Sequence, residues 1–231
     1  MPCDTGCGKQ GARQEHGDIV RREVDRPAMR SRWAAHSGRI AGESMPPRRI
    51  SGMKGLPLIQ PEDASGETAD LLAATQQALG ITPNLVKALA NSPAVLRAYL
   101  GFSGALRGGS LPAAVHEQLG LLVAQEAGCD YCLSAHTYIG TKLAGLSQPE
   151  AAQAREGRSG QRLAAVALGF AAALLRGQGH VTDAELCAAR DGLSDSQLAE
   201  VAAHVALGIF TSYFANAARV PVDWPLVRHA D

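Results

Sequence analysis

The chain has 231 residues, in which 22 lysines and arginines balance 22 aspartates and glutamates. A net charge of zero argues against nucleic acid or an anionic membrane surface as the main partner, because both attract strongly basic proteins. Aromatic residues make up only 4% of the chain, while alanine is abundant, and this composition favours closely packed helices over sheets.

Residues 1–52 differ in composition from the remainder of the chain. They are rich in Arg, Gly, Ser and Pro and show no sustained apolar period. This composition predicts a disordered leader, or a start codon placed too far upstream. We therefore expect one folded domain over residues 53–231.

From Met53 onward the apolar residues recur with a helical period, and no segment alternates with the period of two expected of a strand. Glycines and prolines mark the boundaries, and Ser92, Thr182 and Ser194 are residue types that cap helix N-termini. The predicted fold class is all-α, with helices over residues 63–79, 84–90, 93–106, 110–127, 129–146, 159–176, 182–190 and 195–218.

The longest apolar run, residues 163–175, has 13 residues. A bilayer needs about 20, so the run predicts a buried core helix, and no signal-peptide pattern opens the chain. The five cysteines are too few and too scattered for the disulfide framework of a small secreted domain. We expect a cytoplasmic protein without a membrane partner.

A weak internal echo joins two of the predicted helices. A shift of 82 positions places residues 111–132 over residues 193–214, and Thr211 and Phe214 then stand where the first copy has cysteines. The echo indicates either an internal helical duplication, in which only the first copy kept the chemistry, or a chance likeness between Ala-rich helices.

The segment EAGCDYCLSAH, residues 126–136, carries the most reactive side chains of the chain. Cys129 and Cys132 form a C-x-x-C pair, and His136 follows four residues later. At about 100° per residue, all three lie on one face of a helix. They lie near its N-terminus, where free amides and the helix dipole lower the pKa of a thiol. His136 is one turn beyond Cys132, within reach to bond to that thiol or relay its proton.

Glu117 adds a carboxylate from the preceding predicted helix, on a side that also carries Gly120 and Ala124. Small neighbours invite another helix to approach, and a carboxylate in such a place needs a partner or a raised pKa. If the chain turns tightly at Gly128, Glu117 lies about 16 Å back along one helix and His136 about 12 Å along the other. The two side chains then come within direct or one-water reach, which predicts a relay from glutamate through histidine to the thiols.

Three interpretations of the cysteine pair are open at this point. Dithiol redox chemistry accounts for the histidine on the same face. A zinc site would use Cys129, Cys132 and His136, with Glu117 or water as the fourth ligand, although no second C-x-x-C or H-x-x-H pair accompanies them. Simple packing is the third, because cysteine is among the most buried residue types.

With these residues in hand, the chain resembles the alkylhydroperoxidase D-like (AhpD-like) branch of the carboxymuconolactone decarboxylase superfamily. The resemblance rests on the E-x(11)-C-x-x-C-x-x-x-H pattern from Glu117 to His136 and covers about residues 56–228. It implies an AhpD-like all-helical domain that assembles as a homotrimer or homohexamer. It also implies reduction of hydroperoxides through the cysteine pair, without a bound cofactor. An external dithiol donor, such as a lipoyl protein or a thioredoxin-like protein, would regenerate the pair.

The resemblance assigns Cys132 as the peroxidatic thiol, which becomes a sulfenic acid. Cys129 then resolves it into a disulfide, and His136 and Glu117 shuttle the proton. The helix dipole alone favours Cys129 as the nucleophile, whereas proximity to His136 favours Cys132. One position departs from the pattern. The better-studied peroxidases of this branch carry a histidine between the cysteines, where this chain has Tyr131, and this predicts slower turnover or a different substrate.

Two other functions fit the same residues. A decarboxylase-like lyase would use Glu117 and His136 as acid and base, although members of that side of the superfamily generally lack the C-x-x-C pair. A redox-sensing or zinc-binding subunit would use the cysteines without turnover.

Overall fold

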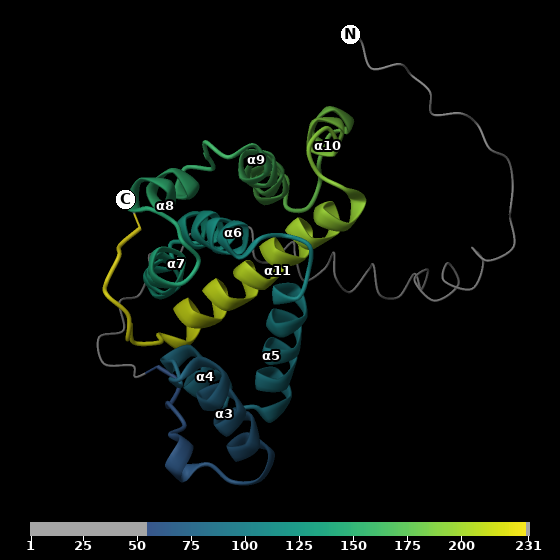
Figure 1. The fold of residues 1–231 in the computed structure, drawn as a ribbon. Coiled ribbons are helices and arrows are strands. Elements are labelled where there is room, and N and C mark those ends of the chain that lie inside the picture. Colours follow the sequence, from purple (N-terminus) through teal and green to yellow (C-terminus); the bar gives the residue numbers. More distant parts are fainter. Residues whose placement is uncertain (1–54, 230–231) are drawn as a thin grey trace, which may run out of the picture. The chain divides into compact units, whose positions relative to one another are not determined.

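The computed structural model describes residues 55–229 (Figure 1). The predicted leader, residues 1–52, lies outside the described residues. The described part contains helices and no strand, which confirms the predicted all-α fold class. Its elements are the short 3-10 helix η1 (Pro61–Asp63), α3 (Gly66–Leu79), α4 (Asn84–Leu89), α5 (Pro93–Arg107), α6 (Ala113–Glu126), α7 (Asp130–Lys142), α8 (Gln148–Arg155), α9 (Arg162–Arg176), α10 (Asp183–Arg190) and α11 (Asp195–Ala218).

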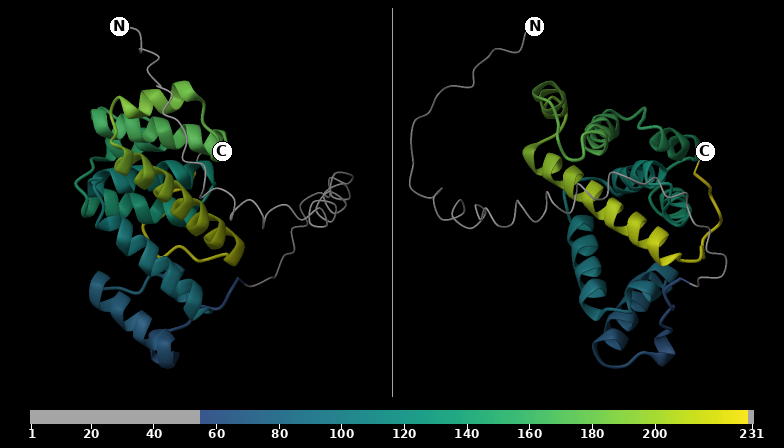
Figure 2. Two further views of the ribbon diagram at one scale, coloured as in Figure 1. Left: turned by 90° about the vertical axis from the view of Figure 1, so that its right-hand side faces the viewer. Right: turned by 180° about the vertical axis from the view of Figure 1, so that it is seen from behind.

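Helix α6 is the centre of the packing, with α7, α8, α9 and α11 arranged around it (Figures 1 and 2). Eight of its fourteen residues are buried, and Leu119, Leu121 and Leu122 are at most 2% exposed. Full burial of each leucine stabilises the fold by about 1.5–3 kcal/mol. Because neighbours cover α6 on several sides, Glu117 lies between α6 and α7.

The predicted N-caps Ser92, Thr182 and Ser194 are confirmed. Each side-chain oxygen accepts a hydrogen bond from the backbone amide three residues later, at 3.2–3.4 Å. At α10 and α11 the third residue also bonds back to the backbone of the cap, which completes a capping box. A cap of this kind stabilises a helix by about 1 kcal/mol.

Two features differ from the sequence-based expectation. Helix α8 was not among the expected helices, although Ser147 and Glu150 begin it with a capping box. The helix expected over residues 129–146 is shorter, because α7 ends at Lys142. Beyond it Gly145 has φ +78°, a left-handed conformation that glycine adopts without steric cost.

The two segments of the internal echo follow different backbone courses. Residues 111–132 include α6, a break at Gly128 and the first turn of α7, whereas residues 193–214 continue into α11 without a break. Gly128 has φ +58°, and its counterpart after the shift is Phe210, inside a continuous helix. The likeness in sequence therefore does not correspond to a repeated helix pattern.

By length and composition alone, α11 could cross a membrane, since it has 24 residues and is strongly apolar. The core helix of a soluble protein passes the same test. Helix α11 packs against α5, α6, α7 and α9, and Val201 and Ser212 are at most 1% exposed. Part of the apolar surface of α11 is thus buried in the helical core.

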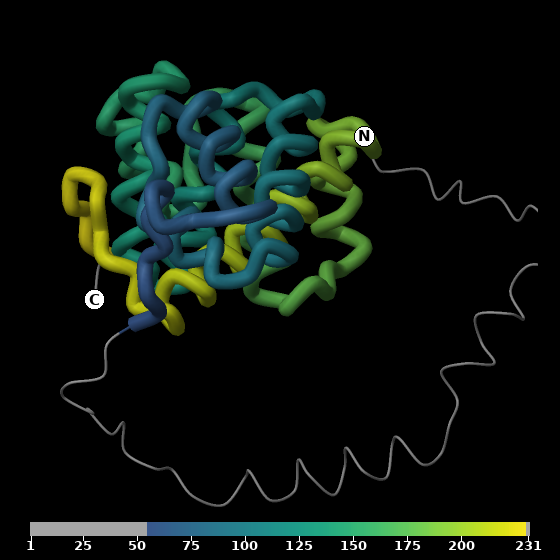
Figure 3. Tube along the Cα trace, turned by 90° about the horizontal axis from the view of Figure 1, so that it is seen from below, coloured from purple at the N-terminus to yellow at the C-terminus, as the bar shows by residue number. Residues whose placement is uncertain are grey.

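After α11 the chain returns along α7 (Figures 1 and 3). Val227 N–H donates to Ser134 Oγ at 2.9 Å, and His229 N–H donates to Asp130 Oδ1 at 2.9 Å. Asp130 and Ser134 lie one turn apart and so share one face of α7. The C-terminal segment fixes this face, and the face that carries Cys132 is turned elsewhere.

Candidate active site

Both cysteines of the C-x-x-C pair lie buried at the N-terminal end of α7. Cys129 is the N-cap of the helix, and its Sγ accepts a hydrogen bond from Cys132 N–H at 3.2 Å. A serine or aspartate oxygen would make the same bond at this place. Cys129 is 0% and Cys132 4% exposed, and both are free thiols. The sulfurs therefore lie together, out of contact with bulk water.

The two thiols differ in acidity. A hydrogen bond from the Cys132 thiol lowers the pKa of Cys129 to about 7. Burial opposes this shift, while the Cys132 N–H and the charge of His136 reinforce it. The same contact between the thiols, together with burial, raises the pKa of Cys132. The first proton therefore leaves Cys129, and the Cys132 thiol stabilises the resulting thiolate.

Glu117 on α6 and His136 on α7 are in direct contact. Glu117 Oε2 lies 2.7 Å from His136 Nδ1, and the two side chains are 15% and 30% exposed. The turn at Gly128 thus brings the predicted residues together without an intermediary. With Nδ1 held by the carboxylate, Nε2 is the ring nitrogen that can exchange a proton with other groups.

Two glycines, one on each helix, allow α6 and α7 to pack closely. A Cβ added at Gly120 would overlap three ring atoms of His136, so the imidazole packs directly against the α6 backbone. A Cβ added at Gly140 would lie 3.0 Å from Leu146 Cδ1 and 3.4 Å from Glu117 Cβ. The sequence predicted that another helix approaches α6 at Gly120. The missing side chain there leaves the space in which His136 contacts Glu117.

The relay lacks one predicted bond. Among residues 55–229, no hydrogen bond joins His136 to either sulfur, because the ring is drawn toward Glu117. His136 acts on the pair through its charge, which lowers the pKa of Cys129. Proximity in sequence to Cys132 therefore did not translate into direct contact.

Helix α11 adds two hydroxyl groups beside the sulfurs. Ser212 is 1% and Thr211 7% exposed. The Ser212 hydroxyl lowers the pKa of both cysteines, and the Thr211 hydroxyl lowers that of Cys132. The sequence contained one signal for them, an adjacent polar pair inside a strongly apolar helix. That signal does not indicate which side chains the hydroxyls contact, because the cysteines are about 80 residues away in the sequence.

Tyr99 faces the same region from α5. Burial raises the pKa of its phenol, Arg107 opposes the shift, and negative charge on Cys132 or Glu117 raises the pKa further. The phenol therefore stays protonated and can serve only as a neutral donor or acceptor near the dithiol.

Tyr131, which stands between the two cysteines in the sequence, contacts a neighbouring helix. It is 5% exposed, and its hydroxyl oxygen accepts a hydrogen bond from Leu85 N–H at 3.0 Å. Burial raises the pKa of its phenol. The side chain ties α7 to the start of α4, and it supplies no titrating group to the sulfurs at neutral pH.

No three histidine, cysteine, aspartate or glutamate side chains converge on a point suited to a metal ion within the part of the chain that the structure describes. The zinc interpretation needed Cys129, Cys132 and His136 around one centre. In the described residues these three side chains do not form such a cluster.

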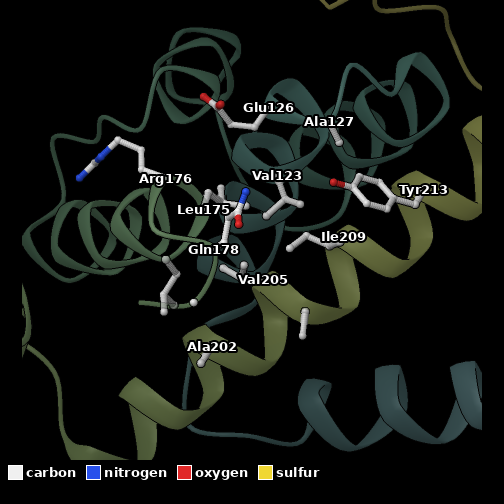
Figure 4. Close-up of a pocket in the computed structure, with 13 residues that line it drawn as sticks. Val123, Glu126, Ala127, Leu175, Arg176, Gln178, Ala202, Val205, Ile209 and Tyr213 are labelled. Carbon is white, nitrogen blue, oxygen red and sulfur yellow. The ribbon is translucent and has the colours of Figure 1, made fainter. Parts of the chain in front are cut away.

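An open pocket with a volume of about 680 Å³ lies between the ends of α6 and α9 and the middle of α11 (Figure 4). Its lining is mostly apolar, and Glu126, Arg176 and Tyr213 supply its larger polar groups. None of the four predicted site residues lines it. The dithiol chemistry and this pocket are therefore separate features of the described domain.

Residues 93–176 match the carboxymuconolactone decarboxylase family, a range that contains all four predicted site residues. No curated protein matches the chain. Several solved structures share the fold, among them these three. An uncharacterized peroxidase-related protein from Silicibacter sp. TM1040 has a TM-score of 0.64 at 24% identity, over 78% of this chain and 95% of that one. An uncharacterized peroxidase-related protein from Ralstonia eutropha JMP134, an alkylhydroperoxidase AhpD core, has a TM-score of 0.62 at 22% identity, over 72% and 90%.

The third structure is a debrominase, Bmp8, in complex with 2,3,4-tribromopyrrole, with a TM-score of 0.63 at 20% identity, over 73% of this chain and 91% of that one. Identities this low establish a common fold and leave function to the site. The E-x(11)-C-x-x-C-x-x-x-H pattern lies within the matched range. Residues 93–176 are thus similar to the carboxymuconolactone decarboxylase family, and the helical domain has the AhpD-like fold.

Proposed function

We propose that the protein reduces hydroperoxides with the Cys129–Cys132 pair and is then reduced by an external dithiol protein. The observation that carries the proposal is a buried dithiol at a helix N-terminus in which Cys129 has a pKa of about 7. A thiolate, unlike a thiol, is an effective nucleophile at neutral pH. Two relatives by fold described as peroxidase-related support the same chemistry.

The reaction proceeds in two steps. The Cys132 thiolate attacks one oxygen of the hydroperoxide, the O–O bond breaks, and Cys132 becomes a sulfenic acid while the alkoxide takes up a proton and leaves as an alcohol. Cys129 then attacks the sulfenic sulfur, so that a disulfide forms and water leaves. Two thiols and one hydroperoxide thus give a disulfide, an alcohol and water. Thiol–disulfide exchange with the donor restores both thiols and oxidises the donor dithiol to a disulfide.

The different acidities of the two thiols require one proton transfer before the first step. The resting charge lies on Cys129, whereas the resemblance assigns attack to Cys132, which is the more exposed of the two residues. A proton shared between the thiols moves from Cys132 to Cys129 before attack, so the reactive thiolate is the minor form. His136, oriented by Glu117, exchanges the remaining proton through a water or the substrate.

Thiol counting after one equivalent of peroxide tests the proposal. The wild type should lose two thiols, and mass spectrometry should place the disulfide between Cys129 and Cys132. Cys187→Ser is the matched control, because Cys187 is an exposed free thiol on α10. This variant should behave as the wild type does. An unchanged thiol count in the wild type would end the proposal.

Single variants separate the roles of the two sulfurs. Cys129→Ser should accumulate a sulfenic acid on Cys132, which dimedone traps, because nothing resolves it. Cys132→Ser should form neither the sulfenic acid nor the disulfide. The reverse pattern would make Cys129 the attacking thiol.

A second candidate function, a decarboxylase-like lyase, is favoured by one observation. The Glu117–His136 contact is direct, and His136 is partly exposed without a bond to either sulfur. Such a pair can act as acid and base without the thiols. A lyase would survive the double variant Cys129→Ser/Cys132→Ser and lose its activity in Glu117→Gln, whereas the peroxidase would be abolished by the double variant.

A further inference from the structure

Ser212 is an unpaired donor in the core. The residue is 1% exposed, and its hydroxyl makes no hydrogen bond of ordinary geometry within the described residues. Leaving a buried hydroxyl unpaired costs free energy, so native structures seldom keep one without a use. A purely structural role would be served as well by alanine.

The surroundings of Ser212 supply that use. Helix α11 packs against both α6 and α7 (Figure 1), and Ser212 lies beside both sulfurs, close enough to lower the pKa of each. When both cysteines are neutral thiols, they hydrogen-bond to each other, and a thiol sulfur is only a weak acceptor for the Ser212 hydroxyl. A sulfur that becomes a thiolate is a much stronger acceptor. Bulk water solvates such a charge poorly here, because both cysteines are buried.

The neighbouring hydroxyl is already engaged. Thr211 Oγ1 donates to the carbonyl oxygens of Leu207 and Gly208, each at 3.1 Å. A single hydroxyl has one proton to donate, so Thr211 must break a bond to its own helix before it can serve a sulfur. Of the two hydroxyls, only Ser212 has its proton uncommitted.

We infer that the Ser212 hydroxyl stabilises the thiolate of the dithiol on whichever sulfur carries the charge. A hydroxyl can rotate, so one group serves Cys129 at rest and Cys132 when the charge moves there for attack. The consequence for peroxide reduction rests on the proposed function, whereas the stabilisation of the thiolate is a property of the resting protein.

Ultraviolet absorbance of the thiolate across a pH series tests the inference in the full-length protein, because it needs no access of a reagent to the buried sulfurs. With Cys3, Cys7 and Cys187 replaced by serine, the first pH midpoint belongs to the Cys129–Cys132 pair. In Ser212→Ala the midpoint should rise by about one pH unit, the loss expected for one hydrogen bond to a charged group. Ser212→Thr, which keeps a hydroxyl, should restore it. Thr211→Val is the matched control and should change the midpoint by much less.

Stability and peroxide consumption complete the test. At a pH below the pKa of Cys129, where both thiols are neutral, Ser212→Ala should unfold at the same temperature as the wild type or higher, because the hydroxyl is then unpaired. A shifted midpoint then reflects the thiolate and not a loosened fold. An unmoved midpoint in Ser212→Ala would overturn the inference. If the midpoint shifts while the wild type consumes no peroxide, the proposed function fails and this inference stands; the opposite result rejects the inference alone.

Discussion

The imidazole of His136 occupies the space in which a side chain at Gly120 would begin. This relationship couples two helices that the chain connects through the turn at Gly128. Glycine is a poor helix former, about 1 kcal/mol worse than alanine in a helix interior. Its place in α6 is therefore explained by the ring it admits and not by the helix itself.

Gly120→Ala should separate these two effects. We expect α6 to remain helical, because alanine favours the helix, while His136 is displaced and its bond to Glu117 is lost. Peroxide-driven disulfide formation should slow by about tenfold or more, the scale of a lost proton-transfer group. Stopped-flow oxidation rates and circular dichroism measure the two outcomes.

The control for Gly120→Ala is Gly101→Ala on α5, where an added Cβ meets nothing within 4 Å. That variant gains the same helix propensity without touching the site, so its oxidation rate should equal that of the wild type. Equal rates in both variants would show that the position of His136 is irrelevant to the dithiol.

Glu117→Gln keeps the shape of the side chain and removes its charge. The amide can still bond to His136 Nδ1, but it no longer stabilises a positive charge that forms on the ring during proton transfer. We expect disulfide formation to slow by about tenfold with the fold intact. Glu126→Gln is the matched control, since Glu126 is an exposed residue of the same helix. An oxidation rate unaltered by Glu117→Gln would remove this carboxylate from the relay.

The sequence predicted the contact between Glu117 and His136 because a tight turn and two regular helices leave few ways to place them. It also predicted the caps, which depend on local residues. It did not predict that Cys129 would be an N-cap sulfur, since a boundary one residue away changes the role of the side chain. Ser212 was out of reach for a different reason. Its position beside the cysteines depends on how α11 packs against α7, a long-range contact that no local pattern encodes.

The paired rings of His116 and His204 predict a loss of stability in acid. Their centroids lie 4.4 Å apart, and each Nε2 is buried without a hydrogen-bond partner among the described residues. Burial lowers the pKa of His116, and burial followed by the charge of His116 lowers the pKa of His204 to about 4. Glu117 and Glu200 oppose both shifts. Both rings are therefore neutral in the folded protein at neutral pH.

In the unfolded chain a histidine has a pKa of about 6.5. The unfolded state therefore takes up protons first as the pH falls, and stability that is complete above pH 6.5 declines toward pH 4. We expect a loss of about 1–2 kcal/mol from this pair, allowing for partial solvent screening. Urea unfolding at pH 7.5 and pH 5 measures it. His204→Leu should flatten the dependence, while His180→Gln, at an exposed site, should leave it unchanged; a slope that persists in His204→Leu contradicts the assignment.

Tyr131→Phe tests whether the residue between the cysteines acts on the fold or on the chemistry. The variant leaves the buried Leu85 N–H without its acceptor, which should lower the free energy of unfolding by about 1–2 kcal/mol. Disulfide formation should stay within about twofold of the wild-type rate, because the phenol is engaged at α4. Urea unfolding and stopped-flow oxidation give the two values. Tyr213→Phe, at a side chain that is 64% exposed, should change neither. A large loss of rate in Tyr131→Phe without a loss of stability would place this tyrosine in the reaction. It would contradict the structural role that the contact with Leu85 assigns.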